Sequence, residues 1–249
     1  MPDNDAAAPG AATAAAPAPA RAWRVVLEKI ERDLLEGRLG PGDRLPPERE
    51  LSTSLGVGRS SVREALRVLE VMGLIRTGTG SGPTSGAIIT ATPRGGLAAL
   101  LRLQVAAHGF PLEDVVATRL LFEEWIVRTL AATPGHDLSE ARAAVEAMDD
   151  VTLTPGEFLA LDAQFHLDLA DASGNVVVAA SMGGLRAAIE GYVRAGAEKV
   201  ADWDAVAVTL RDEHHRILAA IDAGDADTAR TLVHDHIVGY YAATGLSRG

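Results

Sequence analysis

The chain contains no cysteine among its 249 residues, which excludes disulfide bonds and thiolate metal sites. Aromatic residues make up only 4% of the sequence, and Ala, Leu and Val dominate, a composition that favours helices over sheets. No uninterrupted apolar run approaches the roughly 18–20 residues that a membrane-spanning helix needs. The first residues include Asp3 and Asp5, where a signal peptide carries basic residues. These absences predict a cytoplasmic protein that has no membrane partner.

The length of 249 residues is enough for one or two domains with a substantial core. Residues 1–20 are rich in Ala and Pro, and we expect them to form a disordered tail. The net charge of −11 is distributed unevenly over the rest of the chain. Residues 21–90 hold 11 Arg and Lys against 9 Asp and Glu, whereas residues 91–249 hold 12 against 23. A polyanionic partner should therefore bind the first of these segments.

Turn residues divide the weakly basic segment into short elements that predict a helix-turn-helix followed by a hairpin. The expected parts are a helix from Arg21 that ends at Gly37, helices over 48–55 and 59–72, and a hairpin formed by the runs 74–77 and 87–90. We assign this domain to residues 21–91 and a linker to residues 92–96.

Basic residues recur on one face of the expected helix over 59–72. Arg59, Arg63 and Arg67 are four residues apart, which places their guanidinium groups along one side of the helix. The inward stripe of the same helix consists of Val62, Ala65, Leu66, Leu69 and Met72. Such a row of guanidinium groups can contact phosphates and guanine edges in the major groove of DNA. The alternative is that the three arginines simply solubilise a surface helix.

The rest of the sequence is helical in pattern, with separators that contain Pro or Gly. The expected helices span about 97–107, 111–132, 138–150, 155–172, 176–197, 203–223 and 226–243. Helices of this number and length predict an antiparallel bundle with a core of its own, which we assign to residues 97–245. The predicted fold is therefore mainly α, with a small β-hairpin in the first domain and an all-α second domain.

Four side chains that can bind a metal fall on inward faces of these helices. Asp162 and His166 are four residues apart and share a face with apolar residues. His214 and His236 also lie among apolar neighbours at helical spacing, whereas His215 should face water. One inward histidine is more often a hydrogen-bonded core residue, but each isolated buried polar group costs a few kcal/mol. A single divalent cation would satisfy all four, and this N/O donor set suits zinc first, with nickel, manganese or iron as alternatives.

The run GRLGPGDRLPPERELSTSLGVGRSSVREALRVLEVMGLI, residues 37–75, resembles the winged helix-turn-helix of the GntR family of bacterial transcription regulators. The resemblance implies that Arg49, Arg59 and Arg63 contact operator DNA, and that a wing with Gly80 at its tip reaches the minor groove. The full set of expected DNA contacts is Arg44, Arg49, Arg59, Ser60, Ser61, Arg63, Arg67 and Gly80.

Residues 97–243 resemble the FCD domain, the ligand-binding domain of the FadR-type branch of the same family. The matching segments are Asp162-Ala-Gln-Phe-His166, Glu213–Leu218 and Ala229–Ile237. The resemblance implies a metal held by Asp162, His166, His214 and His236, and a carboxylate effector held by the metal and by Arg119. It also places Asn175 near the effector. The alternatives are an ion pair of Arg119 with Glu123, four residues on, and a helix-capping role for Asn175.

These patterns predict a metabolite-responsive transcription regulator, acting as a repressor, rather than an enzyme. A homodimer would bind a pseudo-palindromic operator in double-stranded DNA, because two-fold protein symmetry matches two-fold site symmetry. A small organic acid would be the effector. Two alternatives stay open at this point: a metal-dependent hydrolase or lyase fused to a DNA-binding module, and a direct sensor of the metal itself.

Overall fold

The computed structural model describes residues 19–78, 86–90 and 93–245. Contacts between residues divide the chain into two units, Met1–Thr92 and Pro93–Gly249. Residues 1–18 of the expected tail lie outside the described residues, as does Gly80 of the expected wing. Residues 19 and 20 belong to the first helix, so the helical period starts slightly before the predicted boundary at Arg21.

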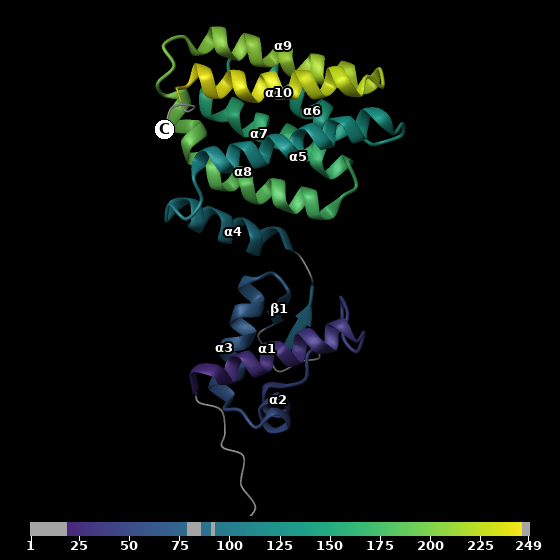
Figure 1. Cartoon of the computed structure of the whole chain (residues 1–249), viewed down its shortest axis with the longest axis vertical. Coiled ribbons are helices and arrows are strands. Elements are labelled where there is room, and N and C mark those ends of the chain that lie inside the picture. The colour runs from purple at the N-terminus through teal and green to yellow at the C-terminus, as the bar shows by residue number, and fades with distance from the viewer. Residues whose placement is uncertain (1–18, 79–85, 91–92, 246–249) are drawn as a thin grey trace, which may run out of the picture. The chain divides into compact units, whose positions relative to one another are not determined.

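Within its described residues, the N-terminal unit consists of three helices and a two-stranded sheet. Figure 1 draws this unit in purple to blue. The elements are α1 (Pro19–Leu35), α2 (Glu48–Leu55), α3 (Arg59–Val71), β1 (Ile75–Gly78) and β2 (Gly86–Ile89). The strands are antiparallel, with Ile75 opposite Ile89. These two residues join Val26, Ile30 and Val62 in the core of the unit. The predicted helix-turn-helix with its hairpin is therefore present, and the fold class is confirmed.

Glycines with left-handed backbone define the ends of α2 and α3. Gly56, with φ of 65°, ends α2, and Gly73, with φ of 73°, reverses the chain after α3. The prediction that Met72 belongs to the inward stripe of α3 is wrong. Met72 is 51% exposed, because α3 ends at Val71 and the turn carries Met72 away from the core.

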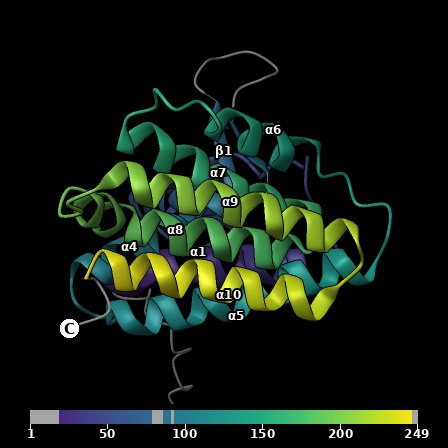
Figure 2. The same cartoon turned by 90° about the horizontal axis from the view of Figure 1, so that it is seen from above.

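The C-terminal unit contains seven described helices that form one core. They are α4 (Pro93–Ala106), α5 (Leu112–Ala132), α6 (Ser139–Met148), α7 (Pro155–Ala172), α8 (Val176–Ala197), α9 (Trp203–Asp222) and α10 (Ala226–Ala243). The principal packing partners are α4 with α8, α5 with α10, α6 with α7, α7 with α8, and α9 with α10. Figure 2 shows the long helices of this unit running beside one another, as expected for a bundle.

The segment predicted as a linker is mostly helical. α4 begins at Pro93 and includes residues 93–96, while Thr92 lies outside the described residues. Proline is compatible with the first turn of a helix because the N–H that it lacks would have no partner there. The two glycines at positions 95 and 96 weaken the helical signal, which is why the pattern places the helix start four residues too late.

Among the described residues, α8 is one helix that is long and apolar enough to cross a membrane by length and composition. Arg186, Glu190 and Arg194 interrupt its sequence, so the criterion of an uninterrupted apolar run does not detect it. The helix packs against α4 and α7, and Arg186 is buried in the unit. These are the contacts of a core helix in a folded bundle.

Candidate metal centre and nucleic-acid interface

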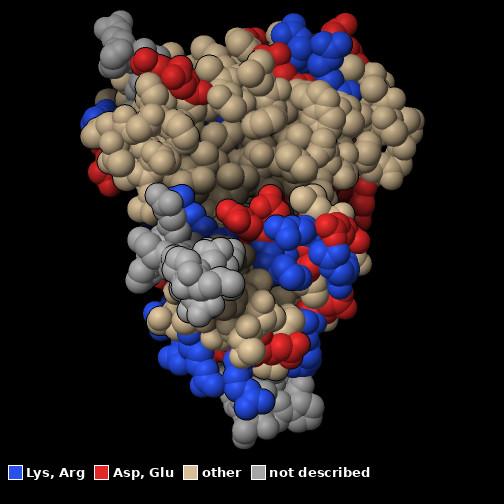
Figure 3. Space-filling view, turned by 60° about the horizontal axis from the view of Figure 1, so that its bottom comes forward, with Lys and Arg blue, Asp and Glu red and all other residues tan. Residues whose placement is uncertain are grey.

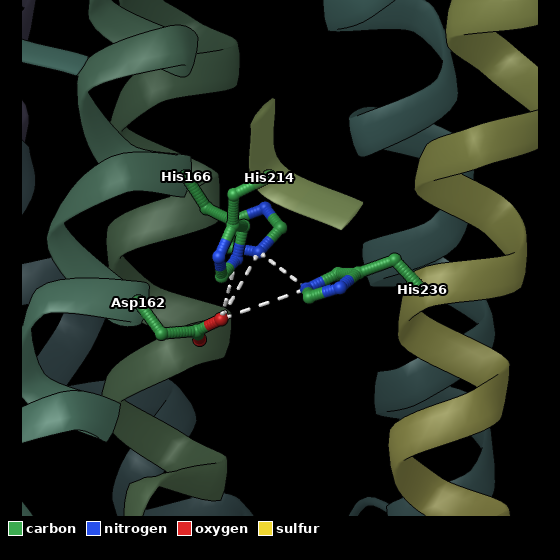
Figure 4. Close-up of side chains that lie close together, drawn as sticks. All are labelled: Asp162, His166, His214 and His236. Atoms are coloured by element: carbon green, nitrogen blue, oxygen red, sulfur yellow. Dashed lines mark hydrogen bonds and ion pairs between the residues drawn. The ribbon is translucent and has the colours of Figure 1, made fainter. Parts of the chain in front are cut away.

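Three helices of the C-terminal unit bring the four predicted metal ligands together. Asp162 and His166 lie one turn apart on α7, His214 lies on α9, and His236 lies on α10. All four are buried, and their candidate ligand atoms lie within 4.8 Å of one another. Figure 4 shows the carboxylate and the three imidazole rings pointing toward a common centre. The helical projection therefore selects four residues that the fold does bring together.

The three imidazole Nε2 atoms surround one carboxylate oxygen. Their distances from Asp162 Oδ1 are 3.1 Å for His214, 3.5 Å for His236 and 3.7 Å for His166. The Nε2 atoms of His166 and His236 are only 3.2 Å apart. At least one nitrogen of that pair must lack a proton, because two N–H groups cannot point at each other at this distance.

Two carboxylates outside the centre fix the orientation of two imidazoles. Nδ1 of His166 lies 2.5 Å from Glu123 Oε2, and Nδ1 of His236 lies 2.8 Å from Glu213 Oε2. An ionised carboxylate only accepts hydrogen bonds, so both Nδ1 atoms donate. In the neutral ring each Nε2 then carries a lone pair directed at the centre, whereas in the protonated ring Nε2 donates to Asp162. Carboxylates that hold the outer nitrogen of a histidine in this way are typical of metal sites.

The electrostatics favour an anionic oxygen surrounded mainly by neutral rings. Burial opposes ionisation of Asp162, but the Arg186 guanidinium and the histidine hydrogen bonds hold its pKa well below the usual range. Burial lowers the pKa of His214 to about 3, and burial with the Arg186 charge also lowers the pKa of His166. Burial also opposes the charged form of His236, but hydrogen bonds to Asp162 and Glu213 outweigh it and raise the pKa of that ring.

The donor set fits a divalent cation. The Nε2 atoms of His166 and His236 lie 3.2 Å from each other and 3.7 and 3.5 Å from Asp162 Oδ1, so one cation between them could contact all three atoms. The Nδ1 atom of His214 is also buried without a hydrogen-bond partner among the described residues. A cation at the centre would be coordinated by these inward atoms, and nitrogen and oxygen donors of this kind suit zinc and its neighbours.

Two buried arginines flank the centre. Arg119 on α5 donates from Nε to Glu123 Oε1 at 2.8 Å, which is the ion pair that its spacing allows. Arg186 on α8 donates from Nη1 to Asp162 Oδ2 at 3.2 Å. Our sequence interpretation missed Arg186. The signal was present, since its helical neighbours Met182, Leu185 and Ile189 are apolar and place it on the inward face.

Capping residues fix where the helices of the centre begin. Thr154 and Glu157 form a reciprocal capping box at the start of α7, and Pro155 follows at the first helical position. Asn175 caps α8, since its side-chain oxygen accepts hydrogen bonds from the N–H groups of Val177 and Val178. Asn175 therefore caps a helix, which was the alternative to a contact with an effector. The effector contact stays a prediction.

The expected DNA contacts lie in the N-terminal unit, where Figure 3 shows Lys and Arg side chains gathered on the surface. Arg59, Arg63 and Arg67 are exposed on α3, and Ser60 is exposed beside them. Arg49 on α2 and Arg44 before it are exposed as well. Ser61 differs, because it is only 8% exposed and faces the core of the unit. Contact of Ser61 with DNA stays a prediction.

Arg63 is held by a neighbouring helix. Its Nε lies 3.1 Å from Glu48 Oε2, and both side chains are partly exposed. Such a surface pair contributes little to stability, but it limits the orientations of the guanidinium group. Arg63 thus extends from the exposed face of α3 in a defined direction.

Two families of known proteins account for both units. Residues 24–84 match the family described as bacterial regulatory proteins, gntR family, and residues 114–239 match the FCD domain. These two matches, one in each unit, define the class of the chain as a transcription regulator. The chain belongs to the GntR family and carries a C-terminal FCD domain, as the resemblance predicts.

Relatives and a solved structure agree with this membership. The chain is 31% identical over 231 residues to the HTH-type transcriptional repressor NanR of Edwardsiella tarda, which covers 88% of this chain and 84% of the relative. It is 31% identical over 161 residues to the Uxu operon transcriptional regulator of Escherichia coli. This match covers 62% of this chain and 60% of that regulator. The structure of Streptococcus agalactiae GntR has the same fold, with a TM-score of 0.62 and 24% identity over 89% of this chain and all of that one. These proteins are regulators rather than enzymes, so the hydrolase or lyase alternative is set aside.

The buried pair of Arg186 and Asp162 yields a stability prediction. We expect Arg186→Met to lower the free energy of unfolding of the metal-free protein by about 3–5 kcal/mol, because the change leaves a buried carboxylate without its compensating charge. Urea denaturation in the presence of a chelator, followed by circular dichroism, measures the difference. The control is Arg194→Met on the same helix, whose side chain is 60% exposed and pairs with Glu190, and whose expected cost is below about 1 kcal/mol. Equal costs for the two variants would contradict the assigned role of Arg186.

Proposed function

We propose that this protein is a metabolite-responsive repressor whose C-terminal unit binds a divalent metal and a small carboxylate. The observation that carries the proposal is the convergence of three imidazole Nε2 atoms on Asp162 Oδ1, with outer carboxylates that keep two lone pairs turned inward. Asp162, His166, His214 and His236 would hold the ion. Zinc fits the donor set first, and nickel, manganese or iron fit it next.

The charge balance supports an anionic effector. Among the buried carboxylates and arginines near the centre, Asp162 and Glu123 offset Arg119 and Arg186. A divalent ion adds two positive charges to this balanced set, and a carboxylate bound beside it would restore part of the balance. When bound, the metal supplies a Lewis-acidic position for a carboxylate oxygen.

The residues around the ion have different parts in this proposal. Arg119 contributes positive charge, but its Nε is engaged by Glu123, so its contacts favour a supporting role over direct contact with the effector. Asn175 is engaged as the cap of α8. Arg186 has two buried nitrogens, Nε and Nη2, that make no hydrogen bond among the described residues, although Nη2 lies 3.9 Å from Glu123 Oε1. These two donors make it the better candidate to hold an anion.

The N-terminal unit would bind operator DNA through its exposed arginines. Arg49, Arg59 and Arg63 are the proposed principal contacts, and Arg44, Ser60 and Arg67 would add contacts to phosphates. Ser61 also belongs to the proposed set, and at 8% exposure it is the least exposed of these side chains. A homodimer would present two such units to a pseudo-palindromic operator. Since the partner is genomic DNA, we place the protein in the cytoplasm.

The effector must bind one arrangement of the protein better than the other in order to change operator affinity. The repressor assignment is supported by the similarity to NanR, which is a transcriptional repressor. The direct metal sensor is the remaining alternative, and titration of operator binding with metal in the absence of any acid distinguishes it. A full loss or gain of operator binding on metal addition alone would favour that alternative.

Arg63→Ala tests the DNA-binding face. We expect this change to weaken discrimination between operator and unrelated DNA by about 1–3 kcal/mol, because an arginine that reads a base edge contributes in that range. Gel-shift titrations at fixed salt measure both affinities. Arg142→Ala, which removes an exposed arginine paired with Asp222 in the C-terminal unit, is the control and should leave both unchanged. If Arg63→Ala binds the operator as tightly as the wild type does, the assignment of Arg63 as an operator contact is wrong.

His214→Ala tests the metal centre. The variant loses one of four donors, so we expect elemental analysis of purified protein to find no stoichiometric metal. His215→Ala is the matched control, because that neighbouring ring is exposed and lies 3.0 Å from Asp149 instead of Asp162. It should retain the wild-type metal content. Metal lost from His215→Ala and retained by His214→Ala would mean that the centre lies elsewhere.

A further inference from the structure

A pocket lies between α7 and α8, next to the centre. Its volume is about 200 Å³. Most of its lining is apolar or small, including Leu159, Ala163 and Leu167 from α7 and Gly183, Ala187 and Val193 from α8. A pocket with such walls favours an apolar ligand surface, because a hydroxyl group buried there would lose its hydrogen bonds to water.

Arg186 connects this pocket to the centre. The residue lines the pocket, and its Nη1 also donates to Asp162 Oδ2 at 3.2 Å. The side chain is 9% exposed, and its Nε and Nη2 atoms are buried with no hydrogen-bond partner among the described residues. Nη2 also lies 3.9 Å from Glu123 Oε1, an ion-pair distance that is too long for a hydrogen bond. Donors of a buried guanidinium group that make no hydrogen bond are costly, and a carboxylate can accept from Nε and Nη2 in a fork.

The remaining charged residues of the pocket are already paired. Glu190 and Arg194 are 3.7 Å apart, and both side chains are more than half exposed. They therefore mark the end of the pocket that faces solvent. The pocket thus has a cationic inner end, apolar walls and a polar outer rim.

We propose that this pocket binds the apolar body of a small monocarboxylate whose carboxylate pairs with Arg186. The inference rests on the proposed carboxylate-responsive function and adds the chemical class of the effector. The volume lies below the roughly 300–1,000 Å³ of sites for drug-sized ligands, so the acid is small. A polyhydroxylated sugar acid of the same length is disfavoured, because its hydroxyl groups would face Leu159, Ala163 and Leu167 without partners.

Two six-carbon acids with different bodies test the ligand class. Calorimetric titration of the zinc-loaded full chain with hexanoate, gluconate and 1-hexanol compares an apolar acid, a hydroxylated acid and an apolar molecule without a carboxylate. We expect hexanoate to bind at least about tenfold more tightly than either of the others. Affinity should rise about fourfold for each methylene added from butanoate to hexanoate. Gluconate binding as tight as hexanoate binding would overturn the proposal.

Two glycines on α8 provide a matched pair of variants. A Cβ added at Gly183, which lines the pocket, or at Gly191, which does not, would meet nothing within 4 Å. Gly183→Leu should fill the pocket and weaken hexanoate binding at least about tenfold, whereas Gly191→Leu should bind hexanoate as the wild type does. Hexanoate binding unchanged by Gly183→Leu, in a protein that keeps its metal, would overturn the location. If Gly183→Leu does not fold, the comparison of the three ligands on the wild-type chain still decides the class.

Failure of this inference differs from failure of the proposed function. If gluconate binds and changes operator affinity while hexanoate does neither, a carboxylate still controls the protein, but the apolar pocket is not its site. If no carboxylate in the series changes operator affinity or binds the loaded protein, both the inference and the carboxylate-responsive function are wrong.

Discussion

The buried carboxylate of Asp162 is the group on which the C-terminal unit depends. An ionised carboxylate in the interior is costly unless positive charge and hydrogen-bond donors surround it. Arg186 from α8 supplies charge, and histidines from α7, α9 and α10 direct their Nε2 atoms at the same oxygen. The contacts of one side chain therefore connect four helices. Any ligand that changes the charge at this point acts on all four at once.

This arrangement gives a physical basis for regulation. A metal at the centre would shift a balanced set of buried charges toward the positive, and an acid beside Arg186 would offset that shift. Because Arg186 both contacts Asp162 and lines the pocket between α7 and α8, occupation of the pocket would change the surroundings of the carboxylate. Operator affinity would change if the protein with the pocket occupied favours a different arrangement of its two units from the protein with the pocket empty.

Sequence reasoning predicts the elements and the four converging side chains because both follow from short-range patterns. Turn residues separate the helices, and helical periodicity places His214 inward and His215 outward, which the burial of these two side chains confirms. Contacts made by tertiary packing are harder to predict. Glu123 and Glu213 approach the outer nitrogens of histidines on other helices, and no local pattern specifies those pairs. Arg186 lies between these two cases. The periodicity of α8 predicts that its side chain points inward, but nothing in the sequence predicts its partner Asp162 on α7. Met72 and the start of α4 are missed because helix ends depend on a residue or two of turn geometry.

The central claim is that Asp162, His166, His214 and His236 form a metal centre. X-ray absorption spectroscopy at the zinc edge of the stoichiometrically loaded full chain tests it most directly. The account predicts scattering from three imidazole rings, with zinc–nitrogen distances of about 2.0–2.1 Å and at least one oxygen in the same shell. A shell of oxygen ligands without imidazole scattering, or a chain that takes up no stoichiometric zinc, nickel, manganese or iron, would contradict it.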